Sequence, residues 1–235
     1  MNSNPQDGTS VKKYGLAFHT ATPELGLAIS NFAGDSRCQT WDLGRSLATD
    51  LHQHLVEFIR PQTWADFAFI AVVKGPGGFT GTRMGMVTAR TLAQQLDIPV
   101  FAISTLAAVA WAQPPQPPLS KGGLLSAQPP LASEGLLSIA LQMPAQRGQL
   151  FGAVYSVNQD SGLTELFPDT VMTAESWQEK LESWENSYQL IEVGSELGWS
   201  VSSVLELAYL EWKQGNRPAW SDALPYCGQH PVKGH

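Results

Sequence analysis

The sequence predicts an α/β protein in which helices pack on mixed sheets. Two short apolar runs between Tyr14 and Ser30, YGLAFHT and GLAIS, are joined by five residues that contain Pro23, which is typical of a β-hairpin. The run FAFIAVV at 67–73 is too short and too uniformly apolar for an amphipathic helix, so it indicates a strand buried on both faces. The segment KGPGGFTGTRMGMVTAR at 74–90 then places four glycines and a proline ahead of a helical pattern.

The elements between these landmarks follow from their spacing. A third strand around 36–43 leads into a helix at 45–59. In that helix, apolar residues recur at helical spacing: Leu47, Leu51, Leu55 and Phe58. After the glycine-rich loop, Thr80 is the expected N-cap of a helix that runs to about Leu96, before Pro99 and a strand VFAIS. This order of elements describes a mixed sheet with helices packed on it.

The second part of the chain begins with a change in composition. The segment at 113–135, QPPQPPLSKGGLLSAQPPLASEG, is rich in Pro, Gly and Ser and cannot form a regular element, so we expect a surface insertion. The runs LLSIALQM and GQLFGAVYSV predict two strands that flank a turn at 144–148. Helices are expected at 175–185 and 202–214.

These elements suggest a division of the chain into lobes. A length of 235 residues is enough for one large domain or for two small lobes that share a cleft. We expect a first lobe at 14–104, completed by the helix near 202–214. A second, smaller lobe at 105–199 would contain the proline-rich insertion, and 215–235 would form a C-terminal tail.

Composition and charge narrow the function classes. The net charge of −7 argues against a protein that holds nucleic acid through phosphate contacts alone, because that mode needs a basic face. Two cysteines far apart, Cys38 and Cys227, do not form a disulfide scaffold and fit a reducing compartment. The first ten residues lack the apolar core of a signal peptide, and no run of 18 apolar residues occurs. We therefore expect a soluble cytoplasmic protein.

The motifs predict neither a bound nucleotide cofactor nor a metal. The loop that begins at Gly75 is neither a P-loop nor a dinucleotide-binding fingerprint, since no Lys follows Gly81 and Pro76 fixes one φ. His52 and His54 lie two apart on a predicted helix, roughly 200° around it, so they cannot bind one ion together. No pair of histidines is spaced four residues apart.

Four stretches of the chain together resemble the TsaB (YeaZ) family. They are the hairpin GLAFHTAT with GLAIS, the segment AFIAVVKGPGGFTGTRMGMVTARTLAQQLDIPVFAISTLAAVA, the turn PAQRGQLFGAVY and the tail LPYC. The most specific part is the family's Gly-Pro-Gly-x-Phe-Thr-Gly-x-Arg loop, which here comprises Gly75, Pro76, Gly77, Gly78, Phe79, Thr80, Gly81 and Arg83. The resemblance implies an actin-like, Hsp70-like two-lobed fold.

The resemblance also implies a role. Members of the family help to make N6-threonylcarbamoyladenosine in tRNAs that read ANN codons, as non-catalytic partners and inactive paralogs of the catalytic subunit TsaD. The implied partners are therefore a TsaD-like subunit and a TsaE-like ATPase that joins the pair, with tRNA contacted only indirectly. A homodimer through the same helical surface is a further implied state.

Three positions depart from the family pattern. His19 stands where the family usually has an Asp, and an imidazole cannot replace a hard oxygen ligand for Mg²⁺. The plainer interpretation of His19 is a strand-end residue satisfied by its neighbours. Pro144 and Gln149 stand where the family has acidic groups, so this turn lacks carboxylates for acid–base chemistry. An active actin-like ATPase or small-molecule kinase remains the alternative function.

The helix after the loop carries a stripe of small residues. Four of them are spaced four apart: Gly81, Gly85, Ala89 and Ala93. Such a stripe lets another backbone approach closely, either the protein's own sheet or a partner. We favour a partner, because the larger apolar residues lie elsewhere around the helix. Together with the surface that the family implies, this predicts seven partner-binding residues: Leu47, Leu51, His54, Gly81, Gly85, Ala89 and Ala93.

Overall fold

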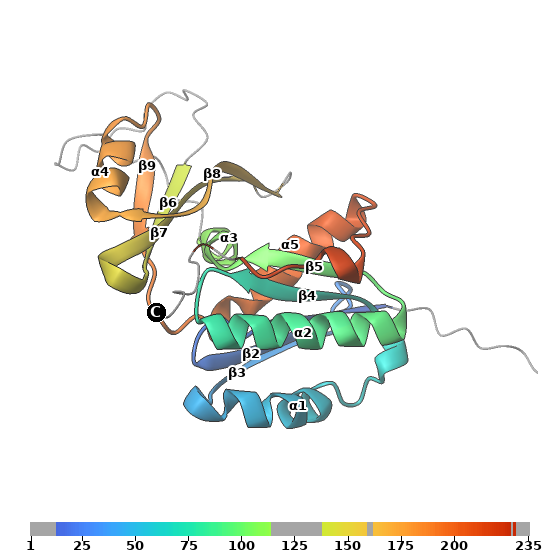
Figure 1. Cartoon of the computed structure of the whole chain (residues 1–235). Helices are drawn as coiled ribbons and strands as arrows, with labels where there is room; N and C mark the ends of the chain where they lie inside the picture. The colour runs from blue at the N-terminus through green and yellow to red at the C-terminus, as the bar shows by residue number, and fades with distance from the viewer. Residues whose placement is uncertain (1–12, 114–137, 159–161, 227, 229–235) are drawn as a thin grey trace, which may run out of the picture.

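The computed structural model describes residues 13–113, 138–158, 162–226 and 228. Most of the proline-rich segment predicted at 113–135 lies outside the described residues. The described residues form two β-sheets with five α-helices around them (Figure 1). The predicted α/β class, with mixed sheets and helices packed on them, is confirmed.

The first sheet has five strands in the order β3-β2-β1-β4-β5. β1 pairs antiparallel with β2, and β2 with β3, whereas β1, β4 and β5 run parallel. The predicted hairpin and the central buried strand are both present. The bounds of the strands are β1 Tyr14–His19, β2 Glu24–Ser30, β3 Ser36–Asp42, β4 Phe67–Gly75 and β5 Val100–Ser104.

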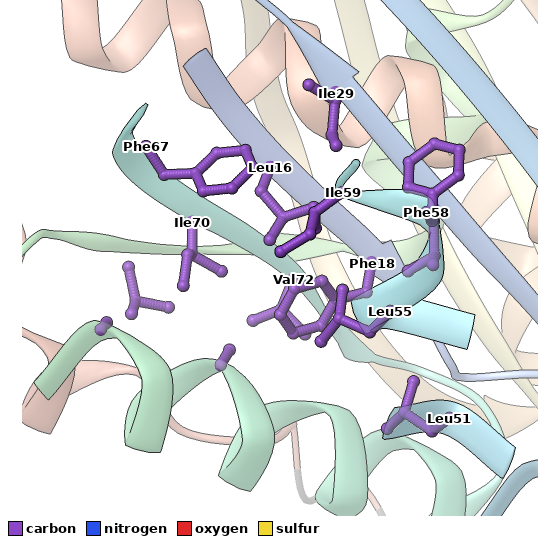
Figure 2. Packing of buried hydrophobic residues seen from close by; sticks show 14 of the residues in the cluster. Leu16, Phe18, Ile29, Leu51, Leu55, Phe58, Ile59, Phe67, Ile70 and Val72 are labelled. Carbon is purple, nitrogen blue, oxygen red and sulfur yellow. The ribbon is translucent and has the colours of Figure 1, made fainter. Parts of the chain in front are cut away.

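Helices cover both faces of this sheet. α1 (Leu47–Phe58) and α2 (Phe79–Leu96) lie on one face, and α5 (Val201–Lys213) lies on the other (Figure 1). Strand β4 supplies Ile70 and Val72 to the first face and Ala71 and Val73 to the second, which is why its sequence is apolar throughout. Figure 2 shows the core on the α1 and α2 side.

The C-terminal end of α1 is held by an arginine from the edge strand. The guanidinium of Arg37 on β3 donates to the backbone oxygens of Phe58, Ile59 and Arg60 at 2.9–3.0 Å. These carbonyls lack helical partners, and α1 has no basic residue in its last turn. Arg37 therefore ties α1 to the sheet.

The second sheet has four strands in the order β8-β7-β6-β9. β6 pairs antiparallel with β7 and parallel with β9. The largest buried side chain packed against this sheet is Trp177, which comes from the helix Ala174–Glu182. Its ring lies over Gly152, and its indole N–H donates to the side-chain oxygen of Gln142 at 2.9 Å. The bounds are β6 Ser138–Pro144, β7 Gln149–Asn158, β8 Gly162–Thr173, β9 Tyr188–Glu192, α3 Thr105–Trp111 and α4 Ala174–Glu182.

Several bounds differ from the sequence predictions. The N-cap of α2 is Gly78, not Thr80, which is the second residue of the helix. Three elements were not predicted from the sequence: α3, β8 and β9. Five short 3₁₀ turns complete the described elements: Gly44–Ser46, Trp64–Asp66, Gln146–Gly148, Gly198–Ser200 and Trp220–Asp222.

Candidate functional site

The glycine-rich loop packs against the turn that joins β1 to β2. A Cβ at Gly77 would collide with the backbone oxygen and the side chain of Ala21, so only glycine fits there. The N–H of Gly78 donates to the same Ala21 oxygen at 2.6 Å. Gly75 has φ of +100°, which again requires glycine. The loop therefore connects β4 to the start of α2 and packs closely against the hairpin turn.

The small-residue stripe of α2 faces the protein's own sheet. A Cβ on Gly81 would collide with the backbone oxygen of Thr20, and one on Gly85 would collide with the Thr20 side chain. Ala89 and Ala93 are fully buried in the core beneath α1 and α2. The prediction that this stripe meets a partner is wrong, because the backbone that approaches closely is the end of β1.

The predicted partner residues of α1 also belong largely to the core. Leu47 and Leu51 are buried against the first sheet. His54 is partly buried, and its ring lies against that of Trp41 with the centroids 4.7 Å apart. Helical periodicity marks the buried face of α1 as readily as it marks a partner face, so these residues do not define an accessible surface.

The outer faces of α1 and α2 carry exposed apolar side chains that are not among the seven predicted partner-binding residues. Val56 on α1 is 46% exposed, and Phe79 and Val87 on α2 are 51% and 62% exposed. α1 and α2 are neighbours on the same side of the first sheet (Figure 1). We call Val56, Phe79 and Val87 the outer helical surface.

A cavity of about 570 Å³ opens between the glycine-rich loop, the turn from β6 to β7 and the C-terminal segment. We call it the loop cleft. The loop and the first turn of α2 form one wall, and Pro144 to Arg147 form the facing wall. Pro225 and Tyr226 line it from the C-terminal segment, and Phe151 lines it from β7.

Hydrogen bonds hold the C-terminal segment in place beside the cleft. The N–H of Tyr226 donates to the backbone oxygen of Lys74, and its hydroxyl donates to the backbone oxygen of Asp169, both at 2.6 Å. The Tyr155 hydroxyl donates to the Asp169 carboxylate at 2.9 Å and lies 3.3 Å from Ser104 Oγ. Burial raises the pKa of the Asp169 carboxyl. Tyr226 thus joins β4 of the first sheet to β8 of the second.

Two arginines line the loop cleft. The guanidinium of Arg83, in the first turns of α2, lies 3.8 Å from the centroid of the Phe79 ring. Arg147 has left-handed backbone angles, with φ of 60° and ψ of 34°, in the turn between β6 and β7. The lining includes no Asp or Glu among the described residues. Of the two turn residues that stand in place of the family's acidic groups, Pro144 lines the loop cleft. Gln149 borders a neighbouring cavity instead.

His19 is buried at the end of β1. Neither ring nitrogen has a hydrogen-bond partner within the described part of the chain, so the expectation that its neighbours satisfy it is wrong. Burial lowers the pKa of His19 to about 3, and the side chain is therefore neutral near pH 7. The hydroxyl of Thr82, which is also buried, has no partner in the described ranges either.

Among the described residues, no group of three or more His, Cys, Asp and Glu side chains is placed to hold a metal ion. No helix in the described ranges is both long and apolar enough to cross a membrane.

Parts of the chain are similar to known proteins. The family model described as "TsaD: tRNA N6-adenosine threonylcarbamoyltransferase" matches residues 60–126, which include the loop and α2. The tRNA threonylcarbamoyladenosine biosynthesis protein TsaB of Bacillus subtilis is 32% identical over 121 residues, 50% of this chain and 42% of that protein. TsaB of Buchnera aphidicola subsp. Acyrthosiphon pisum is 24% identical over 146 residues, 61% of this chain and 58% of that protein. The chain is therefore similar in sequence to TsaB proteins over part of its length.

Two solved structures share the fold of this chain. The structure titled "YeaZ from Pseudomonas aeruginosa" has a TM-score of 0.65 at 18% identity, and the match covers 91% of this chain and 99% of that one. A second Pseudomonas aeruginosa structure, described as similar to YeaZ, has a TM-score of 0.67 at 19% identity over 91% and 98% of the two chains. In sequence, the chain spans about half the length of the curated TsaB relatives it matches.

Proposed function

We propose that this chain is a non-catalytic partner subunit in the synthesis of N6-threonylcarbamoyladenosine in tRNAs that read ANN codons. It binds and supports a TsaD-like catalytic subunit in the cytoplasm, and a TsaE-like ATPase joins the pair. The TsaB relatives, which are named for this biosynthesis, support the process. A homodimer through the same surface is the state we propose when the catalytic subunit is absent.

The observation that carries the binding role is the outer helical surface. Monomeric proteins tolerate single exposed apolar residues, so Val56, Phe79 or Val87 alone would mean little. Their placement on two adjacent helices, of which α2 follows directly after the glycine-rich loop, favours a contact surface. The buried stripe supports this role indirectly, because it fixes α2 on the sheet and leaves the opposite face of the helix free.

A matched pair of charge substitutions tests the surface. Val87→Glu places a charge on the outer helical surface, and Leu190→Glu places the same charge on β9, where Leu190 is similarly exposed at 44%. We expect Val87→Glu to weaken binding to the TsaD-like subunit by about tenfold or more in calorimetry, since a charge at an interface centre must be desolvated. Leu190→Glu should bind like the unchanged chain.

Three outcomes would count against the proposal. Equal binding by Val87→Glu and the unchanged chain would remove α2 from the interface. Equal weakening by both variants would indicate a general effect of charge rather than a surface. Loss of the folded state in Val87→Glu, visible as a lowered melting temperature, would place Val87 in the core.

A further inference from the structure

Alternate residues of β5 direct their backbone groups away from the first sheet. β5 forms the edge of that sheet and pairs only with β4 among its described strands. The N–H of Ile70 on β4 donates to the backbone oxygen of Pro99 at 3.0 Å, which fixes the alternation in this parallel pair. Phe101 therefore bonds toward β4, whereas Val100 and Ala102 face outward.

The outward groups of Ala102 have no partner in the described part of the chain. The N–H of Val100 donates to the backbone oxygen of Pro218, in the segment after α5, at 3.4 Å. Neither the N–H nor the C=O of Ala102 bonds to a described residue. Unpaired groups of this kind are a template for the addition of a further strand.

The other three sheet edges carry residues that discourage strand addition. β3 contains Arg37, β8 contains Pro168 and β9 contains Glu192. β5, with the sequence VFAIS, has neither a charged residue nor a proline. Because charges and prolines protect edge strands, β5 is the edge of the described sheets best suited to accept a strand.

A cavity of about 720 Å³ lies along this edge, and we call it the edge cavity. β5 forms one wall, and residues 216–218 and 222–224 form the other. The chain that follows α5, red in Figure 1, runs beside β5. The volume lies within the usual range for ligand sites, roughly 300–1,000 Å³.

The second wall is anchored to other parts of the fold, so the edge cavity is preformed. The guanidinium of Arg217 lies 4.4 Å from the centroid of the Trp212 ring and donates to the backbone oxygen of Trp212 at 2.7 Å. Trp220 and Ala223 pack against the core beneath α1 and α2. Tyr226 is bonded to β4, as described above. A ligand can therefore enter without displacing this wall.

The lining favours an uncharged, extended ligand. Its basic residues, Lys74 and Arg217, are equal in number to its acidic residues, Glu211 and Asp222. A strongly charged ligand therefore gains little. Leu224, which is 61% exposed, offers an apolar contact beside the unpaired peptide groups of β5. A peptide backbone with an apolar side chain is complementary to both features.

We propose that the edge cavity binds a short extended peptide segment of another protein, which adds to β5 as a further strand. The backbone of the segment pairs with the N–H and C=O of Ala102, and an apolar side chain lies against Leu224. This site is separate from the proposed partner role, because none of Val56, Phe79 and Val87 lines the edge cavity.

Amide hydrogen exchange on the full chain tests the free edge. Without ligand, the amide of Ala102 should exchange at least about tenfold faster than that of Phe101, which bonds to β4. The probe is acetyl-Thr-Val-Thr-Val-Thr-amide, an uncharged peptide with high strand propensity. We expect a Kd of about 1 mM or tighter, so about 10 mM peptide should slow the exchange of Ala102 about tenfold.

Two modified peptides test backbone pairing. One is N-methylated at both valines and the other at all three threonines, so each loses the N–H groups along one edge of the strand. Because an added strand pairs through one edge, one modification should weaken binding about tenfold and the other should have little effect.

Variants of the protein locate the contact by NMR titration with the same peptide. Ala102→Pro removes the outward N–H and leaves the pairing with β4 intact, so it should weaken binding about fivefold or more. Leu224→Ser should weaken binding about threefold or more through lost apolar contact. Leu166→Ser is the matched control, because Leu166 is 42% exposed on β8 and lies outside the edge cavity. If Ala102→Pro does not fold, the two leucine variants decide.

Four results would overturn the proposal. They are equal exchange of the Ala102 and Phe101 amides, no binding at about 10 mM peptide, equal effects of the two methylations, and unchanged binding by Leu224→Ser. Peptide-induced shifts confined to residues outside 100–103 and 222–224 would place the ligand elsewhere and would also overturn it.

Discussion

The side chain of Thr20 occupies the space that a Cβ on Gly85 would need. Thr20 stands where β1 ends, and Gly85 lies in the second turn of α2, so this contact sets how closely the helix approaches the sheet. Gly81 repeats the relationship one turn earlier, against the backbone oxygen of Thr20. The small residues of α2 are therefore a packing requirement of the fold.

Gly85→Leu should destabilise the isolated chain by about 2 kcal/mol or more. The added carbons overpack the contact with Thr20, and the loss exceeds the gain in helix propensity of about 1 kcal/mol. Urea unfolding gives the free energy. Val87→Leu is the control, because Val87 is largely exposed on the same helix, and its effect should stay within about 0.5 kcal/mol. If the Gly85→Leu chain were as stable as the unchanged one, the small-residue stripe of α2 would not pack against the sheet.

His19 should make the protein less stable in mild acid. Its pKa is about 3 when folded, against a usual value of 6.5, so below pH 6.5 only the unfolded state takes up the proton. The resulting loss begins near pH 6.5, grows as the pH falls toward 3 and reaches about 2 kcal/mol at pH 5.

The comparison variant for this effect is His19→Asn, which cannot titrate. We expect the difference in unfolding free energy between pH 7 and pH 5 to be smaller in His19→Asn by about 2 kcal/mol. His52→Asn, at an exposed position of α1, should behave like the unchanged chain. The same pH dependence in all three proteins would mean that His19 is protonated in the folded state.

Trp177 should be the main anchor of α4 on the second sheet. The side chain is 2% exposed, lies against Gly152 and donates to Gln142. Trp177→Ala should cost about 3–5 kcal/mol, as large-to-small core substitutions do. Trp199→Ala removes a tryptophan that is 49% exposed and should cost much less. Chemical unfolding of the two variants compares them directly, and similar losses would contradict the assignment.

Much of the fold was predictable because its strands are apolar runs bounded by turns and its longer helices are periodic. The hairpin, β4, α1, α2 and α5 each show a clear apolar pattern. α3 was not predicted because its sequence, TLAAVAW, is only seven residues long and apolar on all sides, so it shows no helical periodicity. β8 was not predicted because it is an edge strand in which most residues are exposed or half-buried, and because it contains Pro168.

The site was predictable only in part. The small residues of α2 correctly predicted a helix face that another backbone approaches closely, but small residues cannot reveal which backbone that is. The loop cleft is lined by parts of the chain more than 60 residues apart, which include Arg83 and Arg147, and no local pattern contains both. The signal that could have found it was the occurrence of both arginines in the two family-like segments, the loop and the turn PAQRGQ.

The most direct test of the partner role is a tRNA modification assay with purified components. The chain alone should form no threonylcarbamoyladenosine, and adding it to the TsaD-like and TsaE-like subunits should raise formation well above the level without it. Val87→Glu should lose most of this stimulation at limiting concentration, while Leu190→Glu should keep it. Modification by the chain alone, or full stimulation by Val87→Glu, would contradict a non-catalytic subunit that acts through the outer helical surface.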